Sequence, residues 1–368
     1  MTQVLPYNLL ALVLPHFGYA LTDCKVTSLG NGLINGTYLV QANDKTFVLQ
    51  CLNQQVFNEP EQVTNNIDLI STHLNKKQLN QQYALTPIWQ LRSKDNKNHV
   101  KVQGQYWRSL HYIDRSYTIE SIANLTQAHD VASAFAQFTQ ALSDFDSNKL
   151  TEIIPQFHNL SMRIEQCQLA IESATNERLS AAKDYIQFVK SQQLFIDEVT
   201  EIVKSLPLRV THNDTKINNL LFSEETNKPI AVIDLDTCMA GYLMHDFGDM
   251  VRSCSASIAE DSTNVDDMTI DFDMIATLTK AYIASFNGNI TTLEQKSLLL
   301  GIKLMPFMLA IRFLTDFLNG DQYFKTDYTK QNLVRAKSQL HLYKLFCQQE
   351  PLLAEIVLSA STLNVASK

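Results

Sequence analysis

The spacing of hydrophobic residues divides the chain into two parts. Over roughly the first hundred residues, short apolar or alternating runs separated by turn residues predict β-strands. These strands are expected at 25–29, 37–40, 46–50, 87–91, 99–102 and 106–113, and one helix is expected at 59–74. That helix is predicted because Val63, Ile67 and Ile70 follow a spacing of three to four residues.

From Thr118 onward the apolar spacing is mainly helical. Helices are expected at 125–145, 176–206, 272–286, 292–318 and 329–347, and a strand-like segment at 208–233 interrupts them. A β-rich part followed by a helical part predicts an α+β fold with two lobes. We assign residues 1–111 to a small N-lobe and 112–368 to a large helical C-lobe. A cleft between two lobes is a common place for a ligand.

Composition narrows the class of protein. The 368 residues are 45% hydrophobic and 18% charged, which is typical of a globular protein. The net charge of −8 disfavours nucleic acid or an anionic membrane as a partner. Six scattered cysteines without a CxxC pair indicate reduced thiols. No basic leader precedes the first apolar stretch, and no run approaches the ~20 apolar residues of a membrane span. We therefore expect a cytoplasmic protein.

The segment 211–236 carries the candidate chemistry. Asp214 is followed by Lys216 two residues later and by Asn219 five residues later. Two short apolar runs then predict a β-hairpin that ends at Asp234. Such a hairpin would bring Asp234 back beside Asn219. The spacing matches the catalytic loop of protein kinases, in which the Asp is the base and the Asn binds a metal ion.

These residue types suit phosphoryl transfer, which needs an oriented nucleophile and compensation for the negative charge of the phosphates. Asp214 can accept the proton of an attacking hydroxyl group. The side-chain oxygens of Asn219 and Asp234 are the kind of ligand that Mg²⁺ prefers. Lys216 can place its ammonium group on the transferring γ-phosphate. The sequence therefore predicts a kinase that uses ATP and Mg²⁺.

Three neighbouring residues have expected roles outside the chemical step. We expect His212 to pack beneath the loop and to fix its backbone. Asp246 is expected to hold backbone groups of the same loop. Asp236 is either a second metal ligand or an anchor for other side chains, and the sequence leaves both roles open.

These motifs give the chain a family resemblance. The loop 212–219, the strand end 233–236 and the segment 245–249 resemble the aminoglycoside phosphotransferase and choline kinase superfamily, and within it most the N-acetylhexosamine 1-kinases. Further similar stretches are 30–40, 49–57, 106–108, 312–316 and 319–324. The resemblance thus covers nearly the whole chain.

The resemblance implies a protein-kinase-like bilobal fold and transfer of the γ-phosphate of ATP, with Mg²⁺, to a small-molecule hydroxyl. In the hexosamine kinases the acceptor is the anomeric hydroxyl of N-acetylglucosamine or N-acetylgalactosamine, a role in carbohydrate metabolism. Asp214 would then be both base and sugar contact. Arg312 and Tyr323 match positions that help to bind the sugar.

Two alternatives stay open. The acceptor could be choline, homoserine or an aminoglycoside, and a cationic acceptor of this kind would need an acidic or aromatic-lined pocket in the C-terminal half. The candidate acidic residues are Asp261, Asp266, Asp267, Asp271 and Asp273. A nucleotide-binding pseudokinase is the other alternative, although the complete set of Asp214, Asn219 and Asp234 argues against it.

The residues expected to bind the nucleotide differ from the protein-kinase pattern. Protein kinases carry a Lys on the third strand to hold the α- and β-phosphates. Here the third strand reads 47–51 without a Lys. Gln50 is similar to a Gln that the hexosamine kinases show at this place, whereas Cys51 stands where a basic residue is expected. We expect Gln50 and the preceding glycine loop to contact the nucleotide. The loop residues that we assign to this contact are Gly30, Asn31, Gly32, Asn35 and Gly36.

Overall fold

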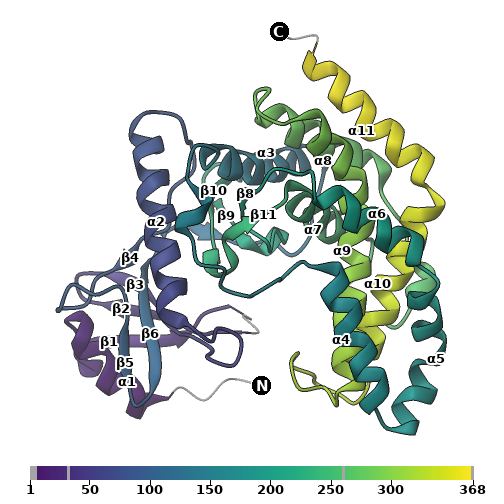
Figure 1. Ribbon diagram of the computed structural model, residues 1–368. Helices are drawn as coiled ribbons and strands as arrows, with labels where there is room; N and C mark the ends of the chain where they lie inside the picture. Colours follow the sequence, from purple (N-terminus) through teal and green to yellow (C-terminus); the bar gives the residue numbers. More distant parts are fainter. Residues whose placement is uncertain (1–5, 31–33, 259–261, 366–368) are drawn as a thin grey trace. The chain divides into compact units, whose positions relative to one another are not determined.

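The computed structural model describes residues 6–30, 34–258 and 262–365, which divide into two compact units (Figure 1). Unit 1 comprises the chain up to Thr118 together with 141–155 and 220–240. Unit 2 comprises 119–140, 156–219 and the chain from Gly241 onward. The chain thus contributes separate stretches to each unit. The single boundary expected after residue 111 stays a prediction.

The main sheet of unit 1 is antiparallel, with strand order β1-β2-β3-β6-β4 and β5 paired to β6. Its strands are β1 (Cys24–Ser28), β2 (Gly36–Ala42), β3 (Thr46–Cys51), β4 (Gln90–Leu91), β5 (Val100–Val102) and β6 (Gln105–His111). The strands expected from the sequence are all present, although the one expected at 87–91 is reduced to two residues. In the register of β3 and β6, Gln50 lies opposite Arg108.

Helices flank this sheet in unit 1 (Figure 1). They are α1 (Tyr7–Val13), which packs on β5, and α2 (Pro60–Leu79), which contacts β4. Pro60 begins α2 at a position where its missing N–H costs nothing. The core of the sheet includes Phe47, Leu49 and Trp107, each almost fully buried.

A second sheet of unit 1 has the order β10-β9-β7. Its strands are β7 (Ser116–Tyr117), β9 (Leu220–Ser223) and β10 (Pro229–Val232). The antiparallel pair β9 and β10 confirms the predicted hairpin, and its register places Leu220 opposite Val232. Asn219 is bonded directly to Leu220, and Asp234 follows Val232 by two residues. Along the chain, the two candidate metal ligands therefore stand directly before β9 and shortly after β10.

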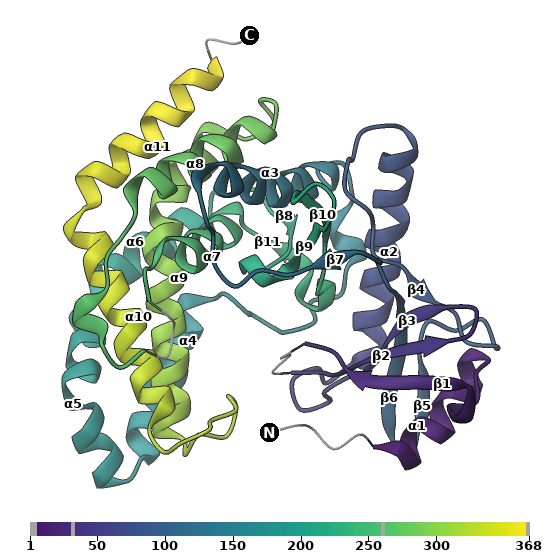
Figure 2. The ribbon, with the colours of Figure 1, turned by 180° about the vertical axis from the view of Figure 1, so that it is seen from behind.

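Unit 2 is mainly helical (Figure 2). Its helices are α3 (Leu125–Ala141), α4 (Leu160–Ser173), α5 (Asn176–Lys190), α6 (Gln193–Val203), α7 (Leu243–Ser255), α8 (Phe272–Ser285), α9 (Thr292–Leu318), α10 (Gln331–Gln348) and α11 (Glu350–Val365). The short strands β8 (Arg209–Thr211) and β11 (Met239–Gly241) precede the catalytic loop and α7. The single helix expected at 176–206 is two helices, α5 and α6, and Ser191 is the C-cap residue at which α5 ends.

Helix α9 is the central helix of unit 2. A capping box of Thr291 and Glu294 begins it, and α7, α10 and α4 pack along it. By length and hydropathy α9 could span a membrane, which corrects the expectation that no run is long and apolar enough. Within the described residues, 78% of its apolar window is buried, as in the core helix of a folded unit.

Candidate active site

One buried carboxylate accepts hydrogen bonds from the backbone of the catalytic loop 212–219. Asp246, in the first turn of α7, accepts the backbone N–H groups of His212 (2.8 Å) and Asn213 (2.7 Å) on its two oxygens. Its own carbonyl accepts the Thr215 hydroxyl. Burial raises the pKa of Asp246 to about 7, and the two N–H groups oppose this by favouring the carboxylate. The expected role of Asp246 is confirmed.

His212 belongs to the scaffold of the loop. Its side chain is fully buried, and its ring meets Phe135 and Phe138 edge-on at centroid distances of 6.1 Å and 5.8 Å. Its Nδ1 accepts the backbone N–H of Asp214 (3.3 Å). The ring therefore fixes the backbone that carries Asp214, as the sequence predicted.

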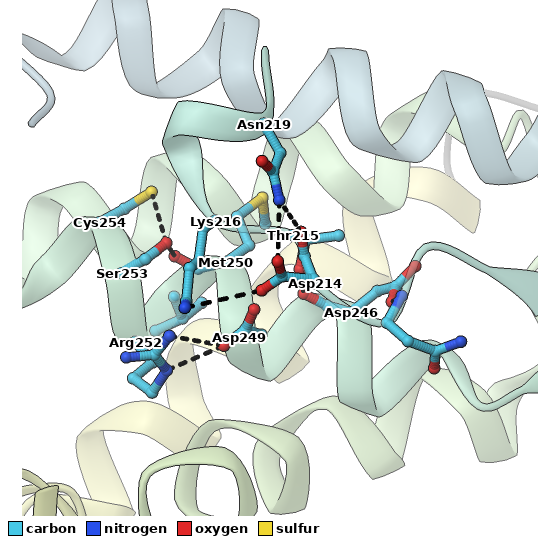
Figure 3. A network of polar contacts seen from close by, with 12 residues as sticks. Asp214, Thr215, Lys216, Asn219, Asp246, Asp249, Met250, Arg252, Ser253 and Cys254 are labelled. Atoms are coloured by element: carbon cyan, nitrogen blue, oxygen red, sulfur yellow. Dashed lines mark hydrogen bonds and ion pairs between the residues drawn. The ribbon is translucent and has the colours of Figure 1, made fainter. Parts of the chain in front are cut away.

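Asp214, Lys216 and Asn219 converge in the loop (Figure 3). The Asn219 amide Nδ2 donates to the Asp214 carbonyl (2.8 Å) and to the Asp214 carboxylate Oδ2 (3.0 Å). The Lys216 ammonium lies 3.8 Å from Oδ1 of the same carboxylate. Asp214 keeps about a third of its side chain exposed, so its carboxylate is oriented and still accessible. Because Nδ2 of Asn219 is engaged, its Oδ1 is the atom left for a metal ion.

Asp234 and Asp236 differ sharply in their surroundings within unit 1. Asp234 is exposed and adopts a left-handed backbone (φ +60°) just before the 3₁₀ turn Leu235–Thr237. Asp236 is buried, and its Oδ1 and Oδ2 accept from Arg108 Nη2 (2.5 Å) and Asn35 Nδ2 (2.7 Å). Of the two roles left open for Asp236, the structure supports the anchor.

The donor set suits Mg²⁺ better than a metal that needs a protein cage. Among the described residues, no three His, Cys, Asp or Glu side chains gather to hold a metal ion. Mg²⁺ commonly takes one or two side-chain oxygens from the protein and completes its shell with water and phosphate. Oδ1 of Asn219 and the exposed carboxylate of Asp234 fit that pattern.

The candidate nucleotide-binding residues are ordered around Gln50. Its Oε1 accepts from Nε (2.9 Å) and Nη2 (2.7 Å) of Arg108, and its Nε2 donates to Thr37 Oγ1 (3.1 Å). Asn35 is fixed by the Asn53 backbone N–H, which donates to its Oδ1 (3.0 Å). Gly30 has φ +70°, a value that favours glycine, and Gly36 begins β2. Asn31 and Gly32 lie outside the described residues.

Arg312 lies among aromatic rings on the C-terminal half of α9. Its guanidinium carbon is 5.0 Å from the ring centre of Phe157, 5.8 Å from that of Tyr323 and 5.4 Å from that of Phe324. It makes no ion pair with any carboxylate among the described residues. We call Phe157, His158, Arg312, Tyr323 and Phe324 the Arg312 cluster. The structure thus brings together the two residues that the resemblance assigned to the acceptor.

Asp316, one turn beyond Arg312 on α9, holds the loop that carries the two aromatic residues. Its carboxylate accepts the backbone N–H groups of Gln322 (2.9 Å), Tyr323 (2.8 Å) and Phe324 (2.9 Å). It also accepts from the Asn332 side-chain amide (2.9 Å). Three N–H groups on one carboxylate fix this loop against the helix.

His158 joins the Arg312 cluster to the catalytic loop. Its Nε2 lies 3.1 Å from the carbonyl oxygen of Asn213, the residue before Asp214. Its ring centre lies 4.8 Å from that of His245, with the two rings tilted by 49°, and within the described residues neither His158 Nδ1 nor His245 Nε2 has a hydrogen-bond partner. Burial and the nearby Arg312 lower the pKa of His158 to about 3. Sequence reasoning missed His158, because no motif marks it and 55 residues separate it from Asn213.

A second guanidinium makes this region cationic. Arg163 donates to the Phe157 carbonyl through Nε (3.2 Å) and Nη2 (2.8 Å). Burial and the proximity of Arg312 lower the pKa of Arg163 to about 10. Its hydrogen bonds support Phe157 beneath the Arg312 guanidinium. The described surroundings of Arg312 therefore carry positive charge without a contacting carboxylate.

Comparisons with known proteins identify the family and the fold of this chain. Residues 25–271 match the model of the phosphotransferase enzyme family. The fold is similar to that of a microcompartment-associated aminopropanol kinase, with TM-score 0.61 and 14% identity over 95% of this chain and 98% of that one. It is also similar to choline kinase from Cryptosporidium parvum (TM-score 0.54, 13% identity, 90% and 92% covered). A third is spectinomycin phosphotransferase in complex with ADP and spectinomycin (TM-score 0.54, 13% identity, 96% and 98% covered).

At these identities the solved structures establish the fold, and the protein-kinase-like α+β fold predicted from the sequence is confirmed. The family model covers about two thirds of the chain, including the glycine loop, the catalytic loop and Asp234. The prediction of a small-molecule kinase is confirmed with it: the chain belongs to the phosphotransferase enzyme family.

Proposed function

We propose that this phosphotransferase transfers the γ-phosphate of ATP to a sugar hydroxyl, and that the acceptor is an N-acetylhexosamine phosphorylated at its anomeric hydroxyl. The observation that carries the proposal is the Arg312 cluster, which His158 connects to the backbone beside Asp214. Aromatic rings suit the apolar faces of a pyranose ring, and a guanidinium donates hydrogen bonds to hydroxyl or amide oxygens.

Charge argues against a cationic acceptor at this cluster. An ammonium group would meet the Arg312 guanidinium, with Arg163 nearby, and the rings that could face it already contact Arg312. Of the acidic residues considered for a cationic pocket, Asp271 caps α8 by accepting the Met274 N–H. A neutral acceptor rich in oxygen atoms suits the described residues better.

The catalytic loop supplies the chemistry of the proposed reaction. Asp214 accepts the proton of the attacking hydroxyl, and Asn219 and Lys216 hold its carboxylate in position. Lys216 adds a positive charge for the transferring phosphate. Oδ1 of Asn219 and the carboxylate of Asp234 would hold Mg²⁺. When bound, the ion supplies charge neutralisation at the phosphates.

The nucleotide is proposed to bind unit 1 through Gln50 and the glycine loop residues Gly30, Asn35 and Gly36. The relative in complex with ADP supports nucleotide use in this fold. Two of the solved relatives are named for amino alcohol acceptors. Amino alcohols are therefore the competing acceptor class, and the cationic surroundings of Arg312 argue against them. A cytoplasmic location also stays a proposal.

A coupled assay of ADP release tests the acceptor. The panel contains N-acetylglucosamine, N-acetylgalactosamine, glucose, choline, aminopropanol and spectinomycin. We expect turnover on the N-acetylhexosamines, with an acid-labile sugar 1-phosphate as the product detected by ³¹P NMR. Turnover on choline or aminopropanol alone would reject the proposed acceptor.

A matched pair of variants tests the role of the Arg312 cluster. Arg312→Gln should raise the acceptor KM at least about 10-fold and leave the ATP KM unchanged, since about 1.4 kcal/mol of lost binding is tenfold. Lys344→Gln removes another cation–ring contact, at 4.2 Å from Phe188, and should change neither KM. If the acceptor KM of Arg312→Gln is unchanged, the Arg312 cluster does not bind the acceptor and no longer supports the proposed N-acetylhexosamine.

A further inference from the structure

Arg108 is a buried cation at the centre of the main sheet. It lies on β6 directly opposite Gln50 on β3, and only 1% of its side chain is exposed. Its Nε and Nη2 both donate to Oε1 of Gln50, and Nη2 also donates to Oδ1 of Asp236. The third strand thus lacks a lysine, but the neighbouring strand places a guanidinium against the residue at the matching position.

The contact with Arg108 fixes the orientation of the Gln50 side-chain amide. Arginine has only donors, so the atom that contacts Arg108 must be the carbonyl oxygen of the amide. The NH₂ group is therefore turned away from Arg108 and donates one hydrogen to Thr37 Oγ1. Its second hydrogen has no acceptor within the described residues. Gln50 is only partly buried, so this donor is available to a ligand.

Asp236 connects the same guanidinium to the glycine loop. Its Oδ1 accepts from Arg108, and its Oδ2 accepts from Nδ2 of Asn35. A buried ion pair adds little net stability, because desolvation offsets the attraction, whereas it can fix a specific arrangement of side chains. Here it joins the third strand, the loop 30–36 and the segment that begins at Asp234.

One donor in this network is still unsatisfied. Nη1 of Arg108 is buried, and the described residues offer it no acceptor. A buried donor without a partner is costly, and such groups in folded proteins usually meet water or a ligand. An oxygen atom of the nucleotide, or a water molecule that bridges to it, would supply the missing acceptor.

We propose that Arg108 is the positioning residue of the nucleotide site and takes over the work of the third-strand lysine of protein kinases. It holds Gln50 so that the amide presents a neutral donor to the nucleotide phosphates, and through Asp236 it holds Asn35 of the glycine loop. The inference rests on the nucleotide site proposed above.

The variant Gln50→Glu separates this role from a purely structural one. A carboxylate accepts from Arg108 at least as well as the amide does, so the melting temperature should stay equal or rise. The donor that faces the nucleotide is replaced by a negative charge. We therefore expect the Kd for MgADP, measured by titration calorimetry, to rise at least about 10-fold. The acceptor KM should stay within about twofold.

Moving the cation back to the third strand is the second test. Arg108→Gln alone should raise the Kd for MgADP and the ATP KM at least about 10-fold. The double variant Gln50→Lys/Arg108→Gln restores one cation beside Asp236 and should recover most of that loss. Arg92→Gln is the matched control, because it breaks another Arg–Asp pair of unit 1, with Asp68 at 2.8 Å, and should leave MgADP binding unchanged.

The outcomes distinguish the role of Arg108 from the nucleotide site itself. MgADP binding to Gln50→Glu and Arg108→Gln at the wild-type Kd would overturn the role of Arg108 and leave the proposed kinase intact. Failure of the double variant to bind better than Arg108→Gln would overturn the comparison with the third-strand lysine. Failure of the wild-type protein to bind any adenine nucleotide would overturn the nucleotide site itself.

Discussion

Gly248 of α7 and Gly301 of α9 meet where the two helices cross. A Cβ atom on Gly248 would lie 2.1 Å from the carbonyl oxygen of Gly301, and one on Gly301 would lie 2.1 Å from the carbonyl oxygen of Met244. Only glycine permits this approach of the two backbones. Because Asp246 lies on α7 between Met244 and Gly248, the same crossing fixes the carboxylate that holds the catalytic loop.

Gly301→Ala should therefore destabilise the protein and impair catalysis together. Alanine in a helix gains ~1 kcal/mol over glycine, but forcing the backbones apart costs about 3 kcal/mol. We expect a net loss of about 2 kcal/mol in the free energy of unfolding, measured by urea denaturation, and a lower kcat. Lys296→Ala, an exposed change in the same helix, is the control. Equal stability of the two variants would contradict the close approach.

Asp246→Asn tests the support of the loop directly. An amide offers one acceptor oxygen, so one of the N–H groups of His212 and Asn213 would face an NH₂ group. We expect a loss of about 2 kcal/mol in the free energy of unfolding, within the range for leaving a buried donor unsatisfied. The kcat should fall as Asp214 shifts. Asp273→Asn, an exposed change in the first turn of α8, should affect neither quantity.

Asp214→Asn should remove the proposed base and leave the fold unchanged. The asparagine oxygen can still accept from Nδ2 of Asn219, so the local hydrogen bonds persist. We expect kcat to fall at least about 100-fold, the usual scale for a positioned acid–base group. The ATP KM and the urea midpoint should match those of the wild type. A near-normal kcat would mean that another group accepts the proton.

The sequence predicted the parts of the site that lie close together along the chain. Asp214, Lys216 and Asn219 fall within six residues, and a short hairpin connects Asn219 to Asp234, so spacing alone indicates their chemistry. The antiparallel strands of the main sheet could also be predicted, because turn residues separate the short apolar runs that form them. Helix α9 was predicted at its observed ends, 292–318, by its long apolar pattern.

Contacts between distant parts of the chain were not predictable in this way. Arg108 and Asp236 are 128 residues apart, and only the pairing of β3 with β6 places Arg108 beside Gln50. The sequence therefore suggested a missing cation on the third strand, whereas the fold provides one from the next strand. The break between α5 and α6 was missed because the sequence around Ser191 contains neither Gly nor Pro to mark it.

The adjacent buried rings of His158 and His245 make stability depend on pH in a predictable direction. Burial and Arg312 lower the pKa of His158 to about 3, and burial and His158 lower that of His245 well below its usual value of about 6.5. Both rings stay neutral in the folded protein while the unfolded chain takes up protons below pH 6.5. Stability is therefore fully present above pH 6.5 and is lost as the pH falls toward 3.

The size of this loss is measurable by urea denaturation at pH 7.5, 6.5 and 5.5. Each buried neutral histidine can contribute up to ~1.4 kcal/mol per pH unit below the pKa of the unfolded chain. His158→Gln removes one such group, so its stability should fall less steeply between pH 6.5 and 5.5 than that of the wild type. His129→Gln, at a largely exposed histidine, should keep the wild-type slope. If His158→Gln also keeps that slope, His158 takes up protons in the folded protein as it does in the unfolded chain, and its pKa is not lowered by burial and Arg312.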